Sequence, residues 1–322
     1  MTRVLVTGAG GPAGVAVIRS LLRRGDVDVL AADMDRWASA LYLVPAGNRR
    51  LVPAGLADDF VDVVTRMCAA DRVDVLVPTV DVELPRLAAA RDALAAAGTR
   101  LASPSLHTLD VCLDKLALSH ACRGALRVPR TELLGTPQAL SGWEFPVIVK
   151  PRRGAGSRGV RQVGSARELD AVHDEDDLLV QELLPGQEYS VDVLADSTGH
   201  VVAAVPRARL RVDSGVAVAG VTVRDDGLVQ AASAVARAVG LTSVANVQLK
   251  RDRDGVPALL EVNPRFPGAM PLTIAAGVDM PSLLLDDVLG RPVPRHLDYT
   301  EVANVRYLED VFLPVGDVLP EP

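Results

Sequence analysis

The stretch ALLEVNPRFPG, residues Ala258 to Gly268, decides how this 322-residue sequence is interpreted. Ala258 to Leu260 predicts a short strand, after which Glu261, Asn263 and Arg265 fall at alternate positions. Because side chains alternate between the two faces of a strand, these three groups are expected on one face. A carboxylate, a carboxamide and a guanidinium there would suit a magnesium–phosphate assembly. The alternative is a strand that ends in a polar, proline-broken turn.

A second polar strand is predicted directly before this stretch. Asn246, Gln248 and Lys250 alternate along it, and the sequence from Asp252 to Gly255 is typical of a hairpin turn. A hairpin would place Gln248 beside Glu261 in the neighbouring strand. We therefore expect these two residues to form a cross-strand pair of ligands.

The composition indicates a globular protein, since hydrophobic residues make up 49% and charged residues 23% of the sequence. The net charge of −7 gives no basic field for a phosphate backbone, so nucleic acid is not an expected partner. Cys68, Cys112 and Cys122 lack metal-type spacing, which favours free thiols in a cytoplasmic protein. No signal-peptide pattern and no apolar run of membrane-spanning length is present, so no membrane partner is expected.

The first 105 residues predict an α/β domain with four strands, in which strands alternate with helices. One of these helices is expected over 84–97, and a further helix over 106–122. The first strand leads into Thr7 to Gly14 (TGAGGPAG), a turn that fits G-x-G-x-x-A, and Asp33 stands at the spacing of a ribose-binding acid. The turn is either a dinucleotide site or a tight turn that packs a helix close to a strand. Asp81 and Glu83 follow a later strand and either hold a cationic substrate group or cap the next helix, and we slightly favour capping.

A basic glycine loop follows the predicted strand 145–151. Lys150 stands at the end of that strand, and the loop from Arg152 to Gly159 has three glycines within six residues. Such a loop lets backbone N–H groups close over phosphate oxygens, while the lysine adds a point charge. The spacing of a Walker P-loop is absent. A flexible hairpin tip is the alternative, and we favour phosphate binding.

Two further strand patterns carry charge. Glu188, Ser190 and Asp192 alternate after the buried run 178–184, an arrangement that could offer backbone groups to an adenine and a carboxylate to a ribose. By itself this pattern is only a strand, a turn and a strand. Three arginines also alternate along one predicted strand, where like charges repel unless an anion or solvent neutralises them, and we expect an anionic ligand there; they are Arg207, Arg209 and Arg211.

Taken in order, these motifs resemble the ATP-grasp superfamily, in particular its branch similar to one half of the carbamoyl-phosphate synthase large chain. The pieces that carry the resemblance are Asp114-Lys115, Lys150 before the glycine loop, Gln181 to Glu188, Gln248 and Glu261-x-Asn-x-Arg265. The resemblance implies an α/β and α+β architecture. A Rossmann-like pre-grasp domain (1–105) would precede an ATP-grasp domain (106–322) with a lid subdomain at about 116–182 and a core subdomain at about 183–300.

The resemblance also implies ligands for most of these residues. ATP would be held by Lys115, Lys150, Gly156, Ser157, Gln181, Glu182, Leu183, Leu184 and Glu188. The two lysines would contact phosphates, residues 182–184 the adenine, and Glu188 the ribose. Mg²⁺, with Mn²⁺ as an alternative, would be held by Gln248, Glu261 and Asn263. Catalysis would rest on Arg265 helped by Arg209, both steadying an acylphosphate, and on Asn263.

The implied activity is that of an ATP-dependent carboxylate–amine ligase, which forms an amide or peptide bond through an acylphosphate and releases ADP and phosphate. Its partners would be a small-molecule carboxylate and amine, for which we expect an amino acid or small peptide, and a homodimer is plausible for the family. The sequence contains one such unit and no internal repeat, which argues against complete carbamoyl-phosphate synthesis.

Two other classes of function are considered. An NAD(P)-dependent short-chain-type reductase would use Gly8 to Gly14 and Asp33, but its catalysis needs Tyr-x-x-x-Lys, and no tyrosine has a lysine four residues on. A non-catalytic ATP-binding module would be expected to have lost its metal ligands, whereas Gln248, Glu261 and Asn263 are all present. The sequence therefore favours the ligase.

Overall fold

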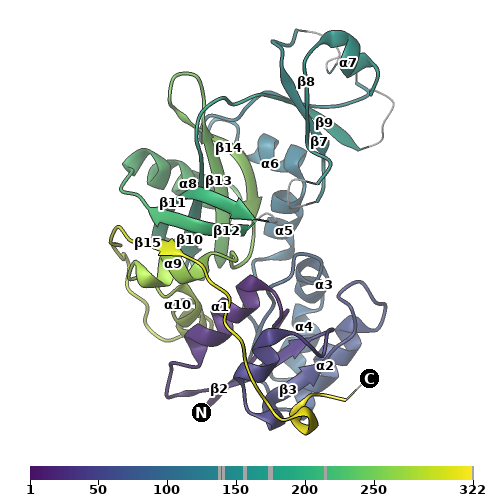
Figure 1. Ribbon diagram of the computed structural model, residues 1–322, viewed down its shortest axis with the longest axis vertical. Helices are drawn as coiled ribbons and strands as arrows, with labels where there is room; N and C mark the ends of the chain where they lie inside the picture. The colour runs from purple at the N-terminus through teal and green to yellow at the C-terminus, as the bar shows by residue number, and fades with distance from the viewer. Residues whose placement is uncertain (137–138, 140–141, 155–157, 173–176, 214–215, 321–322) are drawn as a thin grey trace.

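The computed structural model describes residues 1–136, 139, 142–154, 158–172, 177–213 and 216–320. Within these residues the strands form three sheets, arranged one after another along the long axis of the molecule (Figure 1). The N-terminal sheet lies at one end, a six-stranded sheet in the middle and a four-stranded sheet at the other end. We call these the N-terminal sheet, the central sheet and the lid sheet.

The N-terminal sheet is parallel, with the order β3-β2-β1-β4-β5. Its strands are β1 (Thr2–Thr7), β2 (Val27–Asp33), β3 (Arg49–Leu51), β4 (Val75–Val77) and β5 (Arg100–Leu101). The helices are α1 (Pro12–Leu21), α2 (Phe60–Ala70), α3 (Leu84–Ala89) and α4 (Arg91–Ala96), with short 3₁₀ helices η1 (Ser39–Leu43) and η2 (Ala46–Asn48). The predicted α/β fold of this domain is confirmed.

Two details of the N-terminal prediction are wrong. The domain has a fifth strand, β3, whose sequence Arg-Arg-Leu is half-buried throughout and gives no alternating signal. The helix expected over 84–97 is two helices, because Ala90 between them leaves the helical conformation with φ −93° and ψ 12°.

The central sheet is antiparallel, with the order β14-β13-β10-β11-β12-β15. Its strands are β10 (Glu188–Ala195), β11 (Val201–Asp213), β12 (Val216–Thr222), β13 (Val244–Arg251), β14 (Pro257–Asn263) and β15 (Ala303–Val305). The helix α8 (Asp226–Ala238) packs its apolar side chains against one face, through residues such as Val191, Val247 and Val235. The opposite face packs apolar residues such as Leu194 and Val205 with residues of the two helices that follow β14, and its polar part carries the candidate site.

Two short helices join the central sheet to the N-terminal domain. They are α9 (Met270–Ala275) and α10 (Met280–Val288), and their buried side chains share one apolar cluster with α1. Met270, Met280 and Leu284 belong to this cluster together with Val17. The two units are therefore held together by a continuous apolar core.

The lid sheet has the order β6-β9-β7-β8. Its strands are β6 (Thr131–Leu133), β7 (Val147–Pro151), β8 (Arg161–Val163) and β9 (Leu178–Glu182), with the helix α7 (Ala166–Asp170) and a small apolar core of its own. Helices α5 (Leu106–Leu113) and α6 (Lys115–Cys122) connect the N-terminal sheet to it (Figure 1). One helix was expected over 106–122, but Asp114 interrupts it with φ −112° and ψ 105°.

The chain crosses between the lid sheet and the central sheet twice, at 123–130 and at 183–187, and both crossings bond to the hairpin β13–β14. Leu259 N donates to Arg127 O at 3.0 Å, and Gly186 N donates to Arg251 O at 3.0 Å. The division into residues 1–105, a lid and a core stays a proposal.

The C-terminal segment returns to the N-terminal domain after β15. It runs past the central sheet to the short helix η4 (Val315–Asp317) beside β3, as Figure 1 shows in yellow. Arg49 Nη1 donates to Asp317 O at 2.7 Å, and Leu319 N donates to the Tyr42 hydroxyl at 3.4 Å. Among the described residues, no helix is long and apolar enough to cross a membrane.

Candidate functional site

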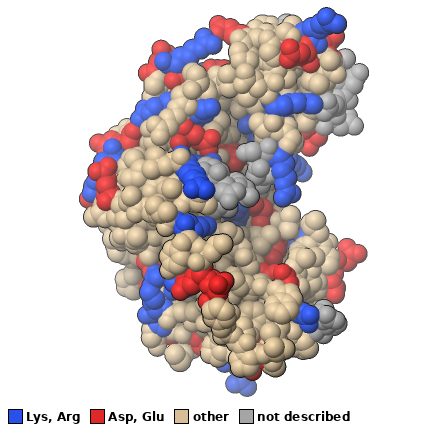
Figure 2. Space-filling model, viewed as in Figure 1, with Lys and Arg blue, Asp and Glu red and all other residues tan. Residues whose placement is uncertain are grey.

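The polar face of the central sheet arises from strict alternation. In β10, Val191 and Val193 point to α8, so Ser190 and Asp192 point to the other side. The same rule applies in β11, β13 and β14, and the face as a whole carries Glu188, Ser190, Asp192, Arg207, Arg209, Asn246, Gln248, Lys250, Glu261 and Asn263. Figure 2 shows the molecule hollowed between the lid and the N-terminal domain, with Lys and Arg side chains near the hollow.

The three predicted magnesium ligands lie together on two paired strands. Gln248 stands opposite Glu261, as the hairpin pattern predicts, and Asn246 stands opposite Asn263. All three side chains are half-buried, and none makes a hydrogen bond or ion pair with the described part of the chain. Their oxygen atoms are therefore available to a ligand.

This donor set fits a magnesium ion that also binds phosphate. Mg²⁺ prefers oxygen ligands and is usually held by one or two carboxylates together with substrate phosphates. Here one carboxylate and two carboxamides are close, and the described residues contain no group of three His, Cys, Asp or Glu side chains that could hold a metal. An ion at Glu261 would thus need phosphate oxygens to complete its ligands.

Two lysines reach the same place from other elements. Lys150, at the end of β7, is only 6% exposed, and its Nζ donates to Gln181 Oε1 at 2.8 Å. Gln181 in turn donates from Nε2 to Thr131 Oγ1 at 2.8 Å. Burial lowers the pKa of Lys150 to about 8, the charge of Lys115 lowers it further, and that of Glu261 opposes this.

Lys115, at the start of α6, donates from Nζ to Gly154 O at 2.7 Å in the glycine loop. Burial lowers its pKa, while the charges of Glu261 and Asp114 act in the opposite direction. The carboxylate of Glu261 thus acts electrostatically on both lysines. The structure brings together two predicted phosphate-binding residues and a predicted metal ligand, each from a different element.

Asp114 fixes Lys115 in position. Its carboxylate caps α6 by accepting from Leu116 N at 3.0 Å, and it pairs with Arg152 Nη2 at 2.6 Å. Burial tends to raise the pKa of Asp114, but the hydrogen bonds and charges of Arg152 and Arg153 hold it at about 2. Asp114 therefore connects the start of α6 to Arg152 and Arg153, which follow Lys150 at the end of β7.

The residues predicted to bind adenine and ribose partly contact other residues of the protein. Glu182 uses its side chain to accept from Arg127 Nη2 at 2.5 Å and Arg130 N at 3.1 Å, which ties the two lid crossings together. Leu183 is half-buried and Leu184 is buried directly after it. Gly156 and Ser157 lie outside the described residues.

Two of the three arginines for which an anionic ligand was expected along β11 pair with acids of β10 in this structure. Arg209 Nη1 donates to Glu188 Oε1, so the residues predicted for the acylphosphate and the ribose pair with each other. Arg207 forms a buried pair with Asp192, with Nε to Oδ2 at 2.9 Å and Nη2 to Oδ1 at 2.7 Å. Acids of the neighbouring strand therefore neutralise these charges, and a register shift at Arg211 breaks the alternation.

Arg265 lies beyond the strand that was expected to carry it beside Glu261 and Asn263. Strand β14 ends at Asn263, because the proline that follows cannot donate to the ladder, and Arg265 N donates back to Asn263 O at 2.8 Å in a tight turn. The Arg265 guanidinium instead binds Asp81 of the N-terminal domain, with Nε to Oδ1 at 2.7 Å and Nη2 to Oδ2 at 2.8 Å.

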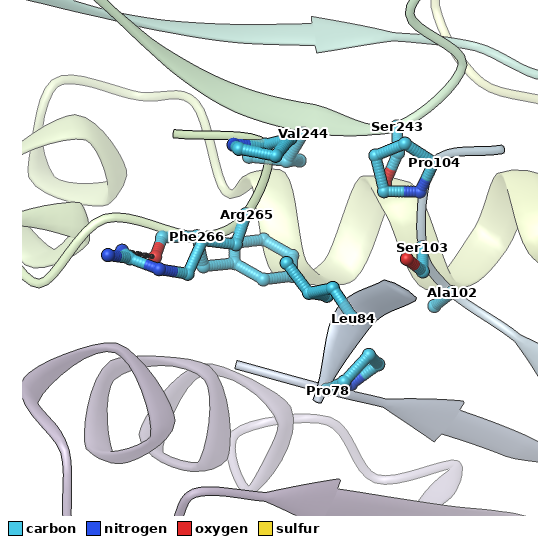
Figure 3. A pocket seen from close by; sticks show the side chains of 10 residues that line it. Pro78, Leu84, Ala102, Ser103, Pro104, Ser243, Val244, Arg265 and Phe266 are labelled. Carbon is cyan, nitrogen blue, oxygen red and sulfur yellow. Dashed lines mark hydrogen bonds between the residues drawn. The ribbon is translucent and has the colours of Figure 1, made fainter. Parts of the chain in front are cut away.

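Figure 3 shows Arg265 in a small pocket at the junction of the N-terminal domain and the central unit. Its lining residues are Pro78, Leu84, Ala102, Ser103 and Pro104 from the first 105 residues, and Ser243, Val244, Pro264, Arg265 and Phe266 from the central unit. The hydroxyl of Ser103 is buried there without a hydrogen-bond partner in the described structure. The pocket therefore lies at the interface between the N-terminal domain and the central sheet, where Arg265 pairs with Asp81.

The capping interpretation holds only for the position of Glu83, which is the N-cap residue of α3. Asp81 is the partner of Arg265, and Glu83 makes no capping hydrogen bond to α3. Glu83 is 5% exposed and accepts from Thr7 Oγ1 at 2.5 Å. Burial raises the pKa of Glu83 to about 7, and the charge of Asp33 adds to this. No local signal announces either contact, because both partners are far away in the sequence.

The glycine turn serves close packing. Gly8 has φ +71°, and a Cβ at Gly14 would lie 2.1 Å from Gly8 O, so the helix approaches the strand as only glycine allows. Asp33, the candidate ribose-binding acid, accepts from Gly10 N at 2.7 Å. Its carboxylate therefore holds the turn itself.

Comparison with known proteins gives two family matches. Residues 4–102 match the model described as "PylC-like, N-terminal domain", and residues 174–311 match "ATP-grasp in the biosynthetic pathway with Ter operon". Among curated proteins, the chain is 30% identical over 208 residues to the vancomycin/teicoplanin A-type resistance protein VanA of Enterococcus faecium. This match covers 54% of the chain and 60% of VanA.

The chain is also 28% identical over 107 residues to the D-alanine–D-alanine ligase of Thermotoga sp. (strain RQ2), covering 32% of the chain and 35% of that ligase. Two solved structures are similar in fold. The L-amino acid ligase from Bacillus licheniformis has a TM-score of 0.69 at 19% identity, covering 89% of this chain and 74% of that one. The N5-carboxyaminoimidazole synthetase from Staphylococcus aureus, complexed with ADP, has a TM-score of 0.74 at 14% identity, covering 92% and 80%.

Proposed function

We propose that this chain, which is an ATP-grasp protein, is an ATP-dependent carboxylate–amine ligase. ATP-grasp enzymes use ATP and Mg²⁺. The similarity to D-alanine–D-alanine ligase and to an L-amino acid ligase supports a small carboxylate and an amine as substrates, of the amino acid or small peptide class. A homodimer is part of the same proposal.

One observation carries the proposal. Gln248, Glu261 and Asn263 present half-buried oxygen atoms with no partner in the described structure, within electrostatic reach of two lysines from other elements. One carboxylate and two carboxamides beside two lysines offer oxygen ligands to a cation and ammonium groups to an anion, so a ligand that carries both charges fits the cluster best. A phosphate chain with its metal ion supplies both anionic and cationic contacts.

The chemistry requires two displacements. An oxygen of the substrate carboxylate attacks the γ-phosphorus of ATP, and the bond to the β-phosphate oxygen breaks, giving an acylphosphate and ADP. The nitrogen of the amine then attacks the acyl carbon, loses a proton, and phosphate leaves. Mg²⁺ would supply neutralisation of the phosphate charge, held by Gln248, Glu261 and Asn263.

Lys150 and Lys115 would bind the phosphates. With a pKa of about 8, Lys150 is mostly a cation at neutral pH, and a bound phosphate favours that cation further. Gln181 holds the Lys150 ammonium in place by accepting its hydrogen bond, and Asp114 fixes the start of α6 and hence Lys115. The protein thus positions both charges before a ligand arrives, which is how phosphoryl transfer is mainly catalysed.

The remaining sequence-derived roles stay proposals. Gln181 to Leu184 would frame the adenine from the end of β9. Arg265 would face the acylphosphate with N–H groups that Asp81 does not use, since a guanidinium has five. Arg209 and Glu188 pair with each other, so contacts to phosphate and to ribose would use their other atoms or require the pair to open.

The test is release of ADP and phosphate from ATP and Mg²⁺ over pooled carboxylates, with and without pooled amines. We expect turnover that requires both pools and is lost in Glu261→Ala. The matched control is Glu144→Ala, which removes a carboxylate that is 81% exposed and paired with Arg253. Turnover that ignores the amine pool, or that survives in Glu261→Ala, would contradict the proposal.

A further inference from the structure

The C-terminal segment adds a charged side chain to the polar face of the central sheet. Strand β15 pairs with β12, with Asn304 opposite Gly220, and Arg306 N continues the ladder by donating to Val218 O at 2.8 Å. Val305 and Tyr307 are 83% and 77% exposed, whereas Asn304 and Arg306 between them are half-buried. This alternation sends Arg306 to the side of the sheet that Val305 and Tyr307 avoid.

That side is the polar face. A Cβ at Gly220 would contact both Asn304 Oδ1, at 3.5 Å, and Leu272 of α9, at 3.4 Å. Helix α9 lies on the polar face, because its Thr273 Oγ1 donates to Asp192 Oδ2 at 2.5 Å. Asn304 is therefore on the polar face, and Arg306, two residues further along the same extended segment, is on it as well.

The Arg306 guanidinium lies against the loop that follows the metal-ligand strand. Its Nη2 donates to Gly268 O at 2.5 Å, and Gly268 stands between Asn263, the last residue of β14, and α9. Burial lowers the pKa of Arg306, and the nearby charge of Arg207 lowers it further. Two guanidinium groups thus lie near each other at one end of the polar face.

Only one of these two charges is neutralised. Asp192 is fully engaged, because it accepts from Arg207, Asn246 and Thr273. Arg306 forms no ion pair within the described part of the chain. A half-buried guanidinium without a carboxylate is costly, and its planar group of N–H donors matches a carboxylate in a bidentate pair.

We propose that Arg306 binds the carboxylate group of the amine substrate, which makes that substrate an amino acid or a compound with an amino-acid-like end. The carboxylate that becomes activated must instead lie by the lysines and Glu261. The Arg306 backbone belongs to the β15 edge of the sheet, but its guanidinium reaches Gly268 in the loop that follows β14, the strand of Glu261. The inference rests on the proposed ligase function and specifies its second substrate.

The test compares amino acids with their primary amides, which keep the amine and lose the carboxylate charge. ADP release is measured with ATP, Mg²⁺ and the carboxylate pool, and products are weighed by mass spectrometry. We expect the wild type to prefer the acids, and Arg306→Gln to lower kcat/KM for them at least tenfold, through KM, with less than a twofold change for the amides. Arg306→Lys should restore part of the preference, because it keeps the charge without the planar fork.

Two variants control for charge and for the segment. Arg295→Gln removes an exposed arginine elsewhere, and Tyr307→Ser alters the outward face of the same extended segment. Both should keep the preference for acids. A wild type that uses acids and amides equally, or an Arg306→Gln variant that keeps the preference, overturns the inference while leaving the ligase function in place.

A second readout does not depend on turnover. Thermal shift is recorded with a non-hydrolysable ATP analogue and Mg²⁺, with the amino acid pool or the amide pool added. A shift that needs the carboxylate and is lost in Arg306→Gln supports the site even if no pool is turned over, in which case the ligase proposal fails separately. No carboxylate-dependent shift in the wild type overturns the inference.

Discussion

Replacing Lys150 by methionine should stabilise the ligand-free protein at neutral pH while weakening its hold on ATP. Lys150 is 6% exposed, and burial lowers its pKa from 10.5 to about 8. At about 1.4 kcal/mol per unit of pKa shift, the buried charge of Lys150 destabilises the folded state by roughly 3 kcal/mol at pH 7. Methionine has a similar length and no charge, so most of that cost disappears.

Part of the gain is offset. Gln181 Oε1 accepts from Lys150 Nζ, and methionine leaves this buried oxygen without its donor, at a cost of about 1–2 kcal/mol. The net expectation is a gain of about 1–2 kcal/mol in the free energy of unfolding at pH 7. Affinity for ATP should fall at least tenfold, because a phosphate contact is lost.

The pH dependence gives the sign of the effect. Between pH 8 and pH 10.5 the unfolded chain binds more protons at Lys150 than the folded chain, so wild-type stability contributed by this group rises with pH. The advantage of Lys150→Met should therefore be full below pH 8 and shrink above it.

Urea unfolding at pH 7 and pH 9.5 measures this, with Lys250→Met as the control for removing a lysine from the polar face. If Lys150→Met destabilises the protein equally at both pH values, the buried charge of Lys150 does not destabilise the folded state, and the reasoning is refuted.

Two further predictions concern the N-terminal domain. Glu83→Gln should raise the free energy of unfolding at pH 8 by about 1–2 kcal/mol, because burial raises the pKa of Glu83 to about 7. Between about pH 4.5 and pH 7 the folded state binds more protons at Glu83 than the unfolded state, so wild-type stability falls as the pH rises. Urea unfolding at pH 5 and pH 8 checks this, and an equal effect of the substitution at both pH values contradicts it. Asp81→Asn should lower kcat of the proposed ligase about tenfold with little change in KM for ATP, since it weakens the grip on Arg265; an unchanged kcat would show that Asp81 does not position that arginine.

The sequence predicted best what short-range patterns control. The alternation of Gln248 and Glu261 across a hairpin turn specified their pairing, because a hairpin sets the register of both strands. The glycine turn at Gly8 to Gly14 was correctly given close packing as one interpretation, since the helix approaches the strand there. In both cases the residues that interact are near each other in the chain.

The failures involve partners far apart in the sequence. Arg265 was extrapolated along a strand that ends two residues earlier, and its partner Asp81 lies 184 residues away. The pairing of Arg209 with Glu188 required the register of β10 and β11, which shifts at an irregularity between Leu194 and Ala195, next to their turn. Arg306 was missed altogether, because the three-residue strand that presents it is too short to show a period.

The double attachment of the lid sheet determines how it can move. Both crossings bond to one hairpin, and Glu182 ties them to each other through Arg127 and Arg130 N. Rotation of the lid about the line through these two crossings would have to break the contacts that Asp114 and Lys115 at the start of α6 make with Arg152 and Gly154 after β7. Lys150, at the far end of β7, would swing toward or away from Glu261 along one arc. One pair of spectroscopic labels, on the lid sheet and the central sheet, would follow this rotation, and Asp114→Ala would make it easier.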